Sequence, residues 1–139
     1  MFGGTRKLAT FLTGYTIVWL VVYIPGETLA TLAMGGPAGL LHANYIVDLV
    51  GMGLMTWGVV SARARRASAP GVLAAGWSWT AAVFWRGTTD RFWWASLGRP
   101  LYFGPIELWL GPMLTGLAIL GMIISLMLLH RERPAQTVR

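Results

Sequence analysis

The chain has 139 residues, of which 55% are hydrophobic and 12% are charged, and its formal net charge is +6. A water-soluble domain carries about twice that share of charged residues, so the composition argues against the soluble globular class. The absence of cysteine excludes disulfides, iron–sulfur clusters, thiol redox sites and cysteine-based zinc sites.

Four apolar segments of the chain are candidates for helices that cross a lipid bilayer. Such a helix needs about 17 to 25 predominantly apolar residues, and the candidate segments are residues 8–24, 40–60, 71–92 and 105–129. The third segment is expected to continue past Arg86. The sequence therefore predicts an all-α integral membrane protein, a single domain built as a four-transmembrane-helix bundle, with a polar tail over residues 130–139.

The first span is expected to stop at Pro25-Gly26, because two helix-breaking residues follow each other there. The next residues, Glu27 to Met34, form a helix-like run that we interpret as a short interfacial helix or as a kinked continuation of the span. The later connection, between the third and fourth spans, is rich in Trp, Tyr and Phe, which is typical of a membrane interface. A cleaved signal peptide is the alternative for the first segment, because of its basic start and the small residues near Ala30.

Lysine and arginine are distributed unequally between the two sides of the predicted bundle. The N-terminus, the 61–70 loop and the C-terminal tail hold eight of them: Arg6, Lys7, Arg63, Arg65, Arg66, Arg131, Arg133 and Arg139. The two other connections hold three: Arg86, Arg91 and Arg99. The positive-inside rule then predicts a multi-pass protein of a bacterial-type inner membrane, with both termini cytoplasmic. Because these residues lie at the edges of apolar runs, we expect no nucleic-acid partner.

Small residues recur at helical spacing within three of the spans and indicate contact faces, because close packing holds helices together in lipid. These stripes contain Val47, Gly51 and Met55 in the second span, Ala74, Ser78 and Ala82 in the third, and Gly121 and Ser125 in the fourth. We expect them to face the interior of the bundle. A dimer interface is the alternative.

Asp48 is the first candidate for a functional residue, because it lies about eight positions inside the second predicted span. A carboxylate in hydrocarbon costs a few kcal/mol unless it is paired, so an acid there is a functional candidate by default. One interpretation is a structural ion pair with Arg86 at matching depth. The other is a role in binding a ligand or a proton, and a misplaced helix start is a third explanation.

The remaining charged residues near the same side have structural explanations of their own. Arg86 can extend to the lipid headgroups or pair with Asp90 one helical turn later. Glu107 follows Pro105 at the start of the fourth span, where a negative charge stabilises the positive end of the helix dipole. Glu27, two residues after a proline, is interpreted in the same way.

Four of the five acids nevertheless fall on this side, which predicts a polar pocket that opens outward. The candidate residues for ligand binding or ion pairing are Asp48, Arg86, Glu107, Glu27, His42, Asp90, Tyr45 and Trp85. With the surrounding aromatic residues, such a pocket suits a ligand with an apolar body and a polar head, such as a quinone or a lipid. It is equally suited to docking an extracytoplasmic partner.

Several kinds of chemistry lack the residues that they need. The two histidines, His42 and His130, lie at opposite ends of the predicted bundle, which argues against bis-histidine haem and against zinc or di-metal sites. Neither a phosphate-binding glycine loop nor a serine in a nucleophile elbow is found. We therefore assign no catalytic residue, no metal and no cofactor beyond a bound lipid or quinone.

These observations leave three functional hypotheses. The first is a non-enzymatic accessory or assembly subunit of a larger membrane complex. The second is a small ligand-binding or proton/solute-coupled transport protein that works as an oligomer around Asp48. The third is a membrane enzyme that modifies a lipid or quinone, with Asp48 or Glu107 as acid or base. The expected partners are the lipid bilayer and other membrane subunits or further copies of the chain.

Overall fold

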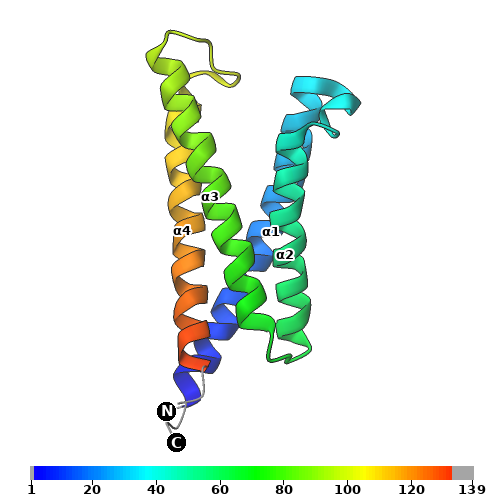
Figure 1. The fold of residues 1–139 in the computed structure, drawn as a ribbon, viewed down its shortest axis with the longest axis vertical. Coiled ribbons are helices and arrows are strands. Elements are labelled where there is room, and N and C mark those ends of the chain that lie inside the picture. The colour runs from blue at the N-terminus through cyan, green and yellow to red at the C-terminus, as the bar shows by residue number, and fades with distance from the viewer. Residues whose placement is uncertain (1, 133–139) are drawn as a thin grey trace, which may run out of the picture.

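The computed structural model describes residues 2–132, which form four long helices and no strand (Figure 1). The elements are α1 (Phe2–Gly39), α2 (Ala43–Arg63), α3 (Ala69–Ser96), the 3-10 turn η1 (Gly104–Ile106) and α4 (Glu107–Glu132). The predicted all-α four-helix bundle is confirmed. Most of the predicted polar tail, including Arg133 and Arg139, lies outside the described residues.

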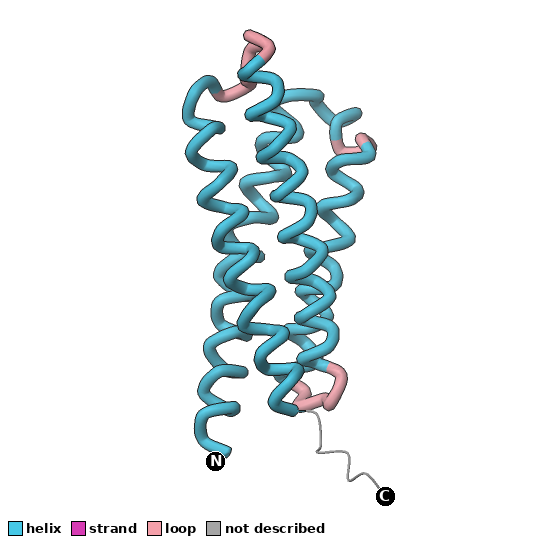
Figure 2. The backbone as a smooth tube through the Cα atoms, turned by 60° about the vertical axis from the view of Figure 1, so that its left-hand side comes forward, coloured by secondary structure: helices cyan, strands magenta, loops and turns pink. Residues whose placement is uncertain are grey.

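The helices run up and down in chain order around the bundle, and α1 also packs against α4 (Figure 2). The most extensive contacts are those of α3 with α4 and with α2. The start of α1, the α2–α3 connection and the end of α4 lie at one end, which we call the basic end (Figure 1). The α1–α2 and α3–α4 connections lie at the other, which we call the far end.

The first helix does not stop at Pro25-Gly26, so the predicted separate interfacial helix is wrong. The alternative, a continuation of the first span through Glu27 to Met34, is what the structure shows. Helix α1 continues through Pro25, and its backbone leaves the helical conformation only at Gly36 (φ 57°, ψ −158°). Proline removes one backbone hydrogen bond, but ending a helix in an apolar environment would leave several groups without partners. The left-handed conformation at Gly36 then folds the chain back, so that a Cβ on Gly39 would lie 2.9 Å from the Thr31 carbonyl oxygen.

Three of the described helical segments are long and apolar enough to cross a membrane, by length and composition alone. They are Gly4–Gly39, Ala43–Arg63 and Gly104–Arg131. Helix α3 is long enough, with 28 residues. However, it carries Arg86, Asp90 and Arg91 in its second half, which makes it the least apolar of the four.

An aromatic core joins α1 to α3 across the middle of the bundle. Trp77 is fully buried, its ring stacks on Tyr15 with centroids 5.0 Å apart, and the edge-on ring of Trp19 lies 5.3 Å away. The Trp77 indole N–H donates a 3.0 Å hydrogen bond to the Thr16 hydroxyl. This satisfies the one polar atom of the largest fully buried side chain, whereas the buried indole nitrogen of Trp19 has no hydrogen-bond partner among the described residues.

Close backbone approach locks α3 between its neighbours toward the basic end. A Cβ on Gly58 would lie 2.6 Å from the Leu73 side chain, and a Cβ on Gly121 would overlap the Trp77 ring. Most of the small residues predicted to face inward are indeed buried, whereas Ala82 is exposed and Val47 and Ser78 are half-buried. Packing of this kind places α2, α3 and α4 in fixed positions at the basic end.

Candidate functional site

A cluster of polar side chains lies in the far half of the bundle, where the α1–α2 hairpin and the α3–α4 hairpin separate (Figure 1). We call it the far-end cluster and define it by Tyr23, Glu27, Asp48, Arg91 and Glu107. Every one of the four helices contributes at least one member. Three of the predicted site residues, Glu27, Asp48 and Glu107, are therefore brought together.

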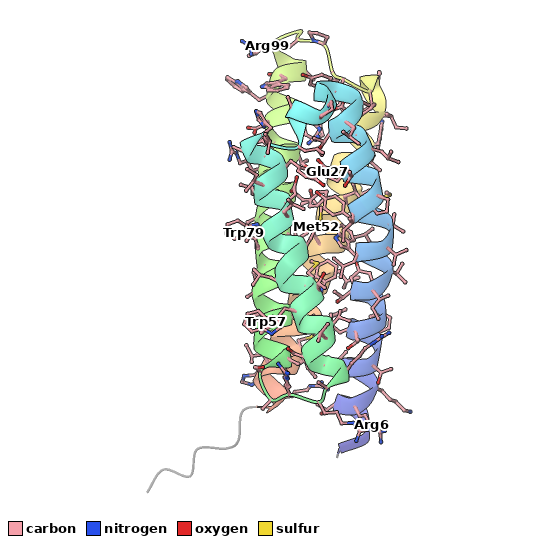
Figure 3. The ribbon with its side chains drawn as sticks, turned by 90° about the vertical axis from the view of Figure 1, so that its right-hand side faces the viewer. Arg6, Glu27, Met52, Trp57, Trp79 and Arg99 are labelled. Carbon is pink, nitrogen blue, oxygen red and sulfur yellow. The ribbon has the colours of Figure 1, made fainter. Side chains whose placement is uncertain are left out.

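Helix α1 contributes Tyr23 and Glu27, which are four positions apart and so share one face of the helix. Both side chains are half-buried, and Glu27 lies on the inner side of α1 (Figure 3). The Thr31 hydroxyl, one further turn along, lies near the Glu27 carboxylate. Helical periodicity thus aligns a phenol, a carboxylate and a hydroxyl along the inside of the bundle.

Asp48 faces this row from α2 and is also half-buried. The Tyr23 hydroxyl lies near its carboxylate. Asp48 and Glu27 lie close enough to repel each other electrostatically, and both are attracted by Arg91. Among the described residues, neither acid forms a direct ion pair.

The predicted ion pair between Asp48 and Arg86 is not formed. Arg86 instead lies 3.7 Å from the Asp90 carboxylate on the outer surface of α3, with 78% and 56% of the two side chains exposed. Helical geometry explains the difference, because Arg91 is five residues after Arg86 and therefore about 140° further round the helix axis. That rotation turns Arg91 toward the cluster and Arg86 away from it.

Arg91 and Glu107 form the only ion pair of the described residues that joins two helices. The Arg91 Nε donates to a Glu107 carboxylate oxygen at 2.9 Å, and the other oxygen accepts a 2.5 Å bond from the Phe103 backbone N–H. Glu107 is 7% exposed, whereas the Arg91 side chain is 44% exposed. Glu107 starts α4 as expected, but its carboxylate is fully partnered across the α3–α4 hairpin.

Sequence analysis missed two members of the cluster, Tyr23 and Arg91. Arg91 was considered only as one of three basic residues on its side of the bundle. Its role depends on the register between α3 and α4, which places residue 91 beside residue 107. That register depends on contacts between residues far apart in the sequence, which the sequence around Arg91 does not show.

The other predicted residues lie outside the cluster. His42 caps the start of α2 by accepting a 3.3 Å bond from the Asn44 N–H. The Tyr45 hydroxyl lies 2.9 Å from that of Thr28, which ties α1 to α2. Trp85 is 61% exposed, and Asp90 pairs with Arg86 on the surface.

Aromatic rings separate the cluster from the core below it. Tyr23 packs against Phe84 with ring centroids 5.1 Å apart and against Trp19 at 5.6 Å. One helical turn beyond Phe84 on α3, the hydroxyl of Thr88 lies 2.8 Å from the hydroxyl of Thr115 and holds α3 to α4. The polar cluster therefore lies directly next to the aromatic part of the core.

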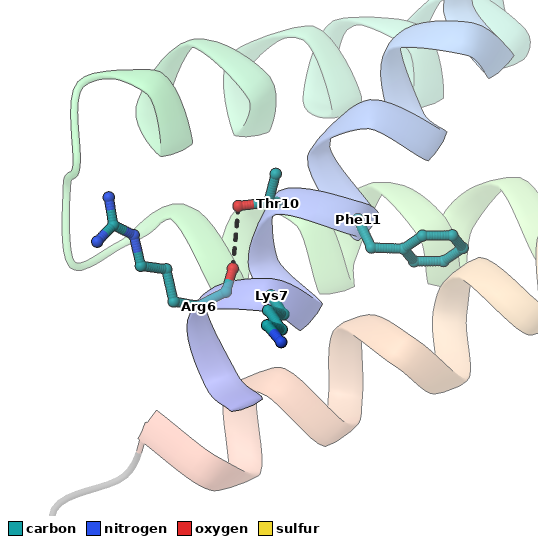
Figure 4. Close-up of a pocket in the computed structure, with 4 residues that line it drawn as sticks. All are labelled: Arg6, Lys7, Thr10 and Phe11. Atoms are coloured by element: carbon teal, nitrogen blue, oxygen red, sulfur yellow. Dashed lines mark hydrogen bonds between the residues drawn. The ribbon is translucent and has the colours of Figure 1, made fainter. Parts of the chain in front are cut away.

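A shallow hollow at the basic end is lined by four residues of α1: Arg6, Lys7, Thr10 and Phe11. Their side chains point apart (Figure 4), so they do not converge on a ligand. Within the described part of the chain, no three His, Asp or Glu side chains are grouped to hold a metal ion.

The arrangement places two carboxylates without a direct cationic partner beside one arginine that is already paired. No known family model, curated protein or solved structure matches this chain.

Proposed function

We propose that the protein crosses a cell membrane four times, with both termini and the Arg63–Arg66 turn in the cytoplasm. The support is that three helices are apolar enough to span, and that basic residues gather at one end of the bundle. Helix α3 is antiparallel to both of its spanning neighbours, and its 28 residues cover about 42 Å at 1.5 Å per residue. That length is sufficient for a fourth crossing.

The chain contains no cysteine, so single cysteines report topology directly. We expect Arg66→Cys in intact cells to resist a membrane-impermeant maleimide and Ser96→Cys to react with it. Labelling of Arg66→Cys from outside, with Ser96→Cys protected, would show the opposite orientation.

Within that membrane protein, the far-end cluster is proposed to bind a ligand that carries a positive charge and an apolar body. The observation that carries this proposal is the pair of half-buried acids, Glu27 and Asp48, beside an arginine already bonded to Glu107. Unpaired carboxylates in an apolar environment cost several kcal/mol. A cation offsets that cost, and the aromatic rings of Tyr23 and Phe84 offer it apolar and cation–π contacts.

The acidic character of the cluster favours a cation over the quinone or lipid considered from the sequence. It also gives little support to an enzyme that uses Glu107 as acid or base. Both oxygens of that carboxylate are bonded, one to Arg91 and one to the Phe103 N–H.

The test is equilibrium binding of tetraphenylphosphonium, a permanent cation with four aromatic rings, to the purified protein in detergent. We expect Asp48→Asn and Glu27→Gln each to weaken binding about tenfold or more, which corresponds to about 1.4 kcal/mol. Asp90→Asn is the matched control, because it removes a carboxylate from the exposed surface and is expected to change affinity less than about twofold. Far-UV circular dichroism confirms that each variant is folded.

Absence of binding to the unaltered protein, or equal affinity in Asp48→Asn, would overturn the proposal. Equal loss in Asp90→Asn would show a general charge effect and would also overturn it.

A second candidate, the accessory subunit, is favoured by the exposed aromatic residues of the far end. Trp85, Trp93 and Trp109 are 61%, 65% and 81% exposed. Tryptophan is enriched both at membrane interfaces and in the centres of protein interfaces. Crosslinking in native membranes followed by purification tests this candidate, and a protein recovered without any crosslinked partner would contradict it.

A further inference from the structure

The Arg63–Arg66 turn joins α2 to α3 at the basic end and contains a left-handed arginine. Arg65 has φ 53° and is the only described residue other than glycine with a positive φ. Its conformation follows from the way α2 ends. The Arg65 N–H donates to the Ala62 carbonyl at 3.0 Å, and the Arg66 N–H donates to the Ser61 carbonyl at 2.9 Å. These two bonds form a Schellman motif, in which the left-handed residue is usually glycine.

An arginine in that place strains the backbone. The Cβ of any L-residue disfavours the left-handed conformation, whereas glycine adopts it freely. The Arg65 side chain does nothing within the fold to offset the strain, because it is exposed and forms no ion pair with another described residue. Strain that is kept at an exposed side chain indicates a role for that side chain outside the fold.

Positive charge accumulates at the basic end without neutralisation by the described side chains. Five exposed basic residues of this end form no ion pair with another described residue: Arg6, Lys7, Arg63, Arg65 and Arg66. Four of the five acids of the chain lie in the far half, and the fifth, Glu132, is the last residue of α4. The end of the bundle that carries the turn therefore attracts anions.

The exposed surface next to the turn is apolar, which favours an anion that carries an apolar body. Val60 and Trp57 lie three and six residues before Arg63 and are 54% and 55% exposed. Trp57 lies on the outside of the bundle (Figure 3). Gly53, one turn earlier, is also exposed, and a Cβ there would meet nothing within 4 Å. This face extends about 9 Å from Arg63 to Trp57 at 1.5 Å per residue, so acyl chains fit along it when a phosphate lies at Arg63.

We propose that the Arg63–Arg66 turn binds the headgroup phosphate of an anionic phospholipid, with the acyl chains along the exposed face of α2. Guanidinium groups donate charge-assisted hydrogen bonds to the phosphate oxygens, and the Schellman motif holds the turn in place for them. This inference rests on the proposed insertion of the protein in a membrane. It is independent of the cation site, which lies at the other end of the bundle.

The test is binding of dioctanoyl phosphatidylglycerol, a short-chain anionic phospholipid, to the purified protein in an uncharged detergent by isothermal titration calorimetry. Dioctanoyl phosphatidylcholine and inorganic phosphate are the comparison ligands. We expect phosphatidylglycerol to bind about tenfold or more tightly than either of them. Equal binding of inorganic phosphate would show a site for free anions, and equal binding of phosphatidylcholine would show an apolar site. Either result would contradict the proposal.

Arg65→Gly is the decisive variant, because glycine keeps the left-handed backbone and removes only the side chain. We expect it to weaken binding of phosphatidylglycerol about fivefold or more. Its resistance to unfolding by sodium dodecyl sulfate is expected to stay equal or to rise, since the strain is relieved. Arg99→Gly is the matched control, because it removes an exposed arginine from the far end. That variant is expected to change affinity less than about twofold.

Unchanged affinity in Arg65→Gly would refute the site. An equal loss in Arg99→Gly would reveal a general charge effect and would refute it as well. A marked loss of stability in Arg65→Gly would show that the arginine serves the fold, which is incompatible with the proposal. Tetraphenylphosphonium binding, measured on the same preparations, tests the cation site separately and is expected to be unaffected by Arg65→Gly.

Discussion

Two glycines of α4, Gly121 and Gly116, allow a matched test of how the basic half is held together. A Cβ on Gly121 would overlap the buried ring of Trp77, whereas a Cβ on Gly116 meets nothing within 4 Å. Both residues lie in the interior of the same helix. Substitution by alanine therefore changes helix propensity equally at the two positions. The two variants differ only in what the new methyl group contacts.

The structure sets the size of the difference. Forcing a methyl group into a packed core costs about 1–3 kcal/mol. A shift of the Trp77 ring also loses its hydrogen bond to Thr16, which is worth about 1 kcal/mol. The gain in helix propensity from glycine to alanine is about 1 kcal/mol and applies to both variants. We therefore expect Gly121→Ala to be less stable than Gly116→Ala by about 2–4 kcal/mol.

The free energy of unfolding is measured by titrating the detergent-solubilised protein with sodium dodecyl sulfate and following helix content by far-UV circular dichroism. Near-UV circular dichroism reports the tryptophan environment and is expected to change in Gly121→Ala alone. Equal stability of the two variants, with an unchanged near-UV spectrum, would refute the proposed contact between α4 and Trp77.

Substitutions at four further polar contacts are tested by the same unfolding measurement. Arg91→Ala leaves a buried carboxylate without its charged partner and is expected to destabilise by about 1–3 kcal/mol. Arg86→Ala breaks an exposed pair and is expected to change stability by less than about 0.5 kcal/mol. Thr16→Val removes the acceptor of the Trp77 N–H and is expected to cost about 1–2 kcal/mol, while Thr10→Val, on the exposed surface, is the control. Asp48→Asn is expected to maintain or raise stability, and Glu107→Gln to lower it by about 1–2 kcal/mol.

The number and approximate positions of the helices were predictable, because the length of an apolar run is a local property of the sequence. The predicted span 40–60 compares with α2 at Ala43–Arg63, and 105–129 compares with α4 at Glu107–Glu132. The end of the first helix was not predictable in the same way. Pro25 marks a break only when water or a turn can satisfy the freed backbone groups, and the sequence alone does not show whether either is present.

The same distinction between local and distant information separates the site residues that could be predicted from those that could not. Glu27, Asp48 and Glu107 were identifiable because a carboxylate within an apolar run stands out by its position along the chain. The choice of Arg86 as the partner of Asp48 was wrong, because position along a helix gives depth but not direction around the axis. Identifying Arg91 needed the rotation of α3 and its register against α4, and both are set by distant contacts such as Trp77 on Gly121.

The opposite effects expected from the two acid-to-amide changes separate a structural carboxylate from a functional one. Glu107 has a charged partner and a backbone donor, so neutralising it removes interactions that hold α3 to α4. Asp48 has a hydroxyl near it and no ion pair, so an amide keeps that contact and removes an uncompensated charge. An acid that can be neutralised without loss of stability carries a charge that does not serve folding, as is expected of a binding residue. If Asp48→Asn instead lowers stability as much as Glu107→Gln does, Asp48 is part of the scaffold, and the cation site loses its central residue.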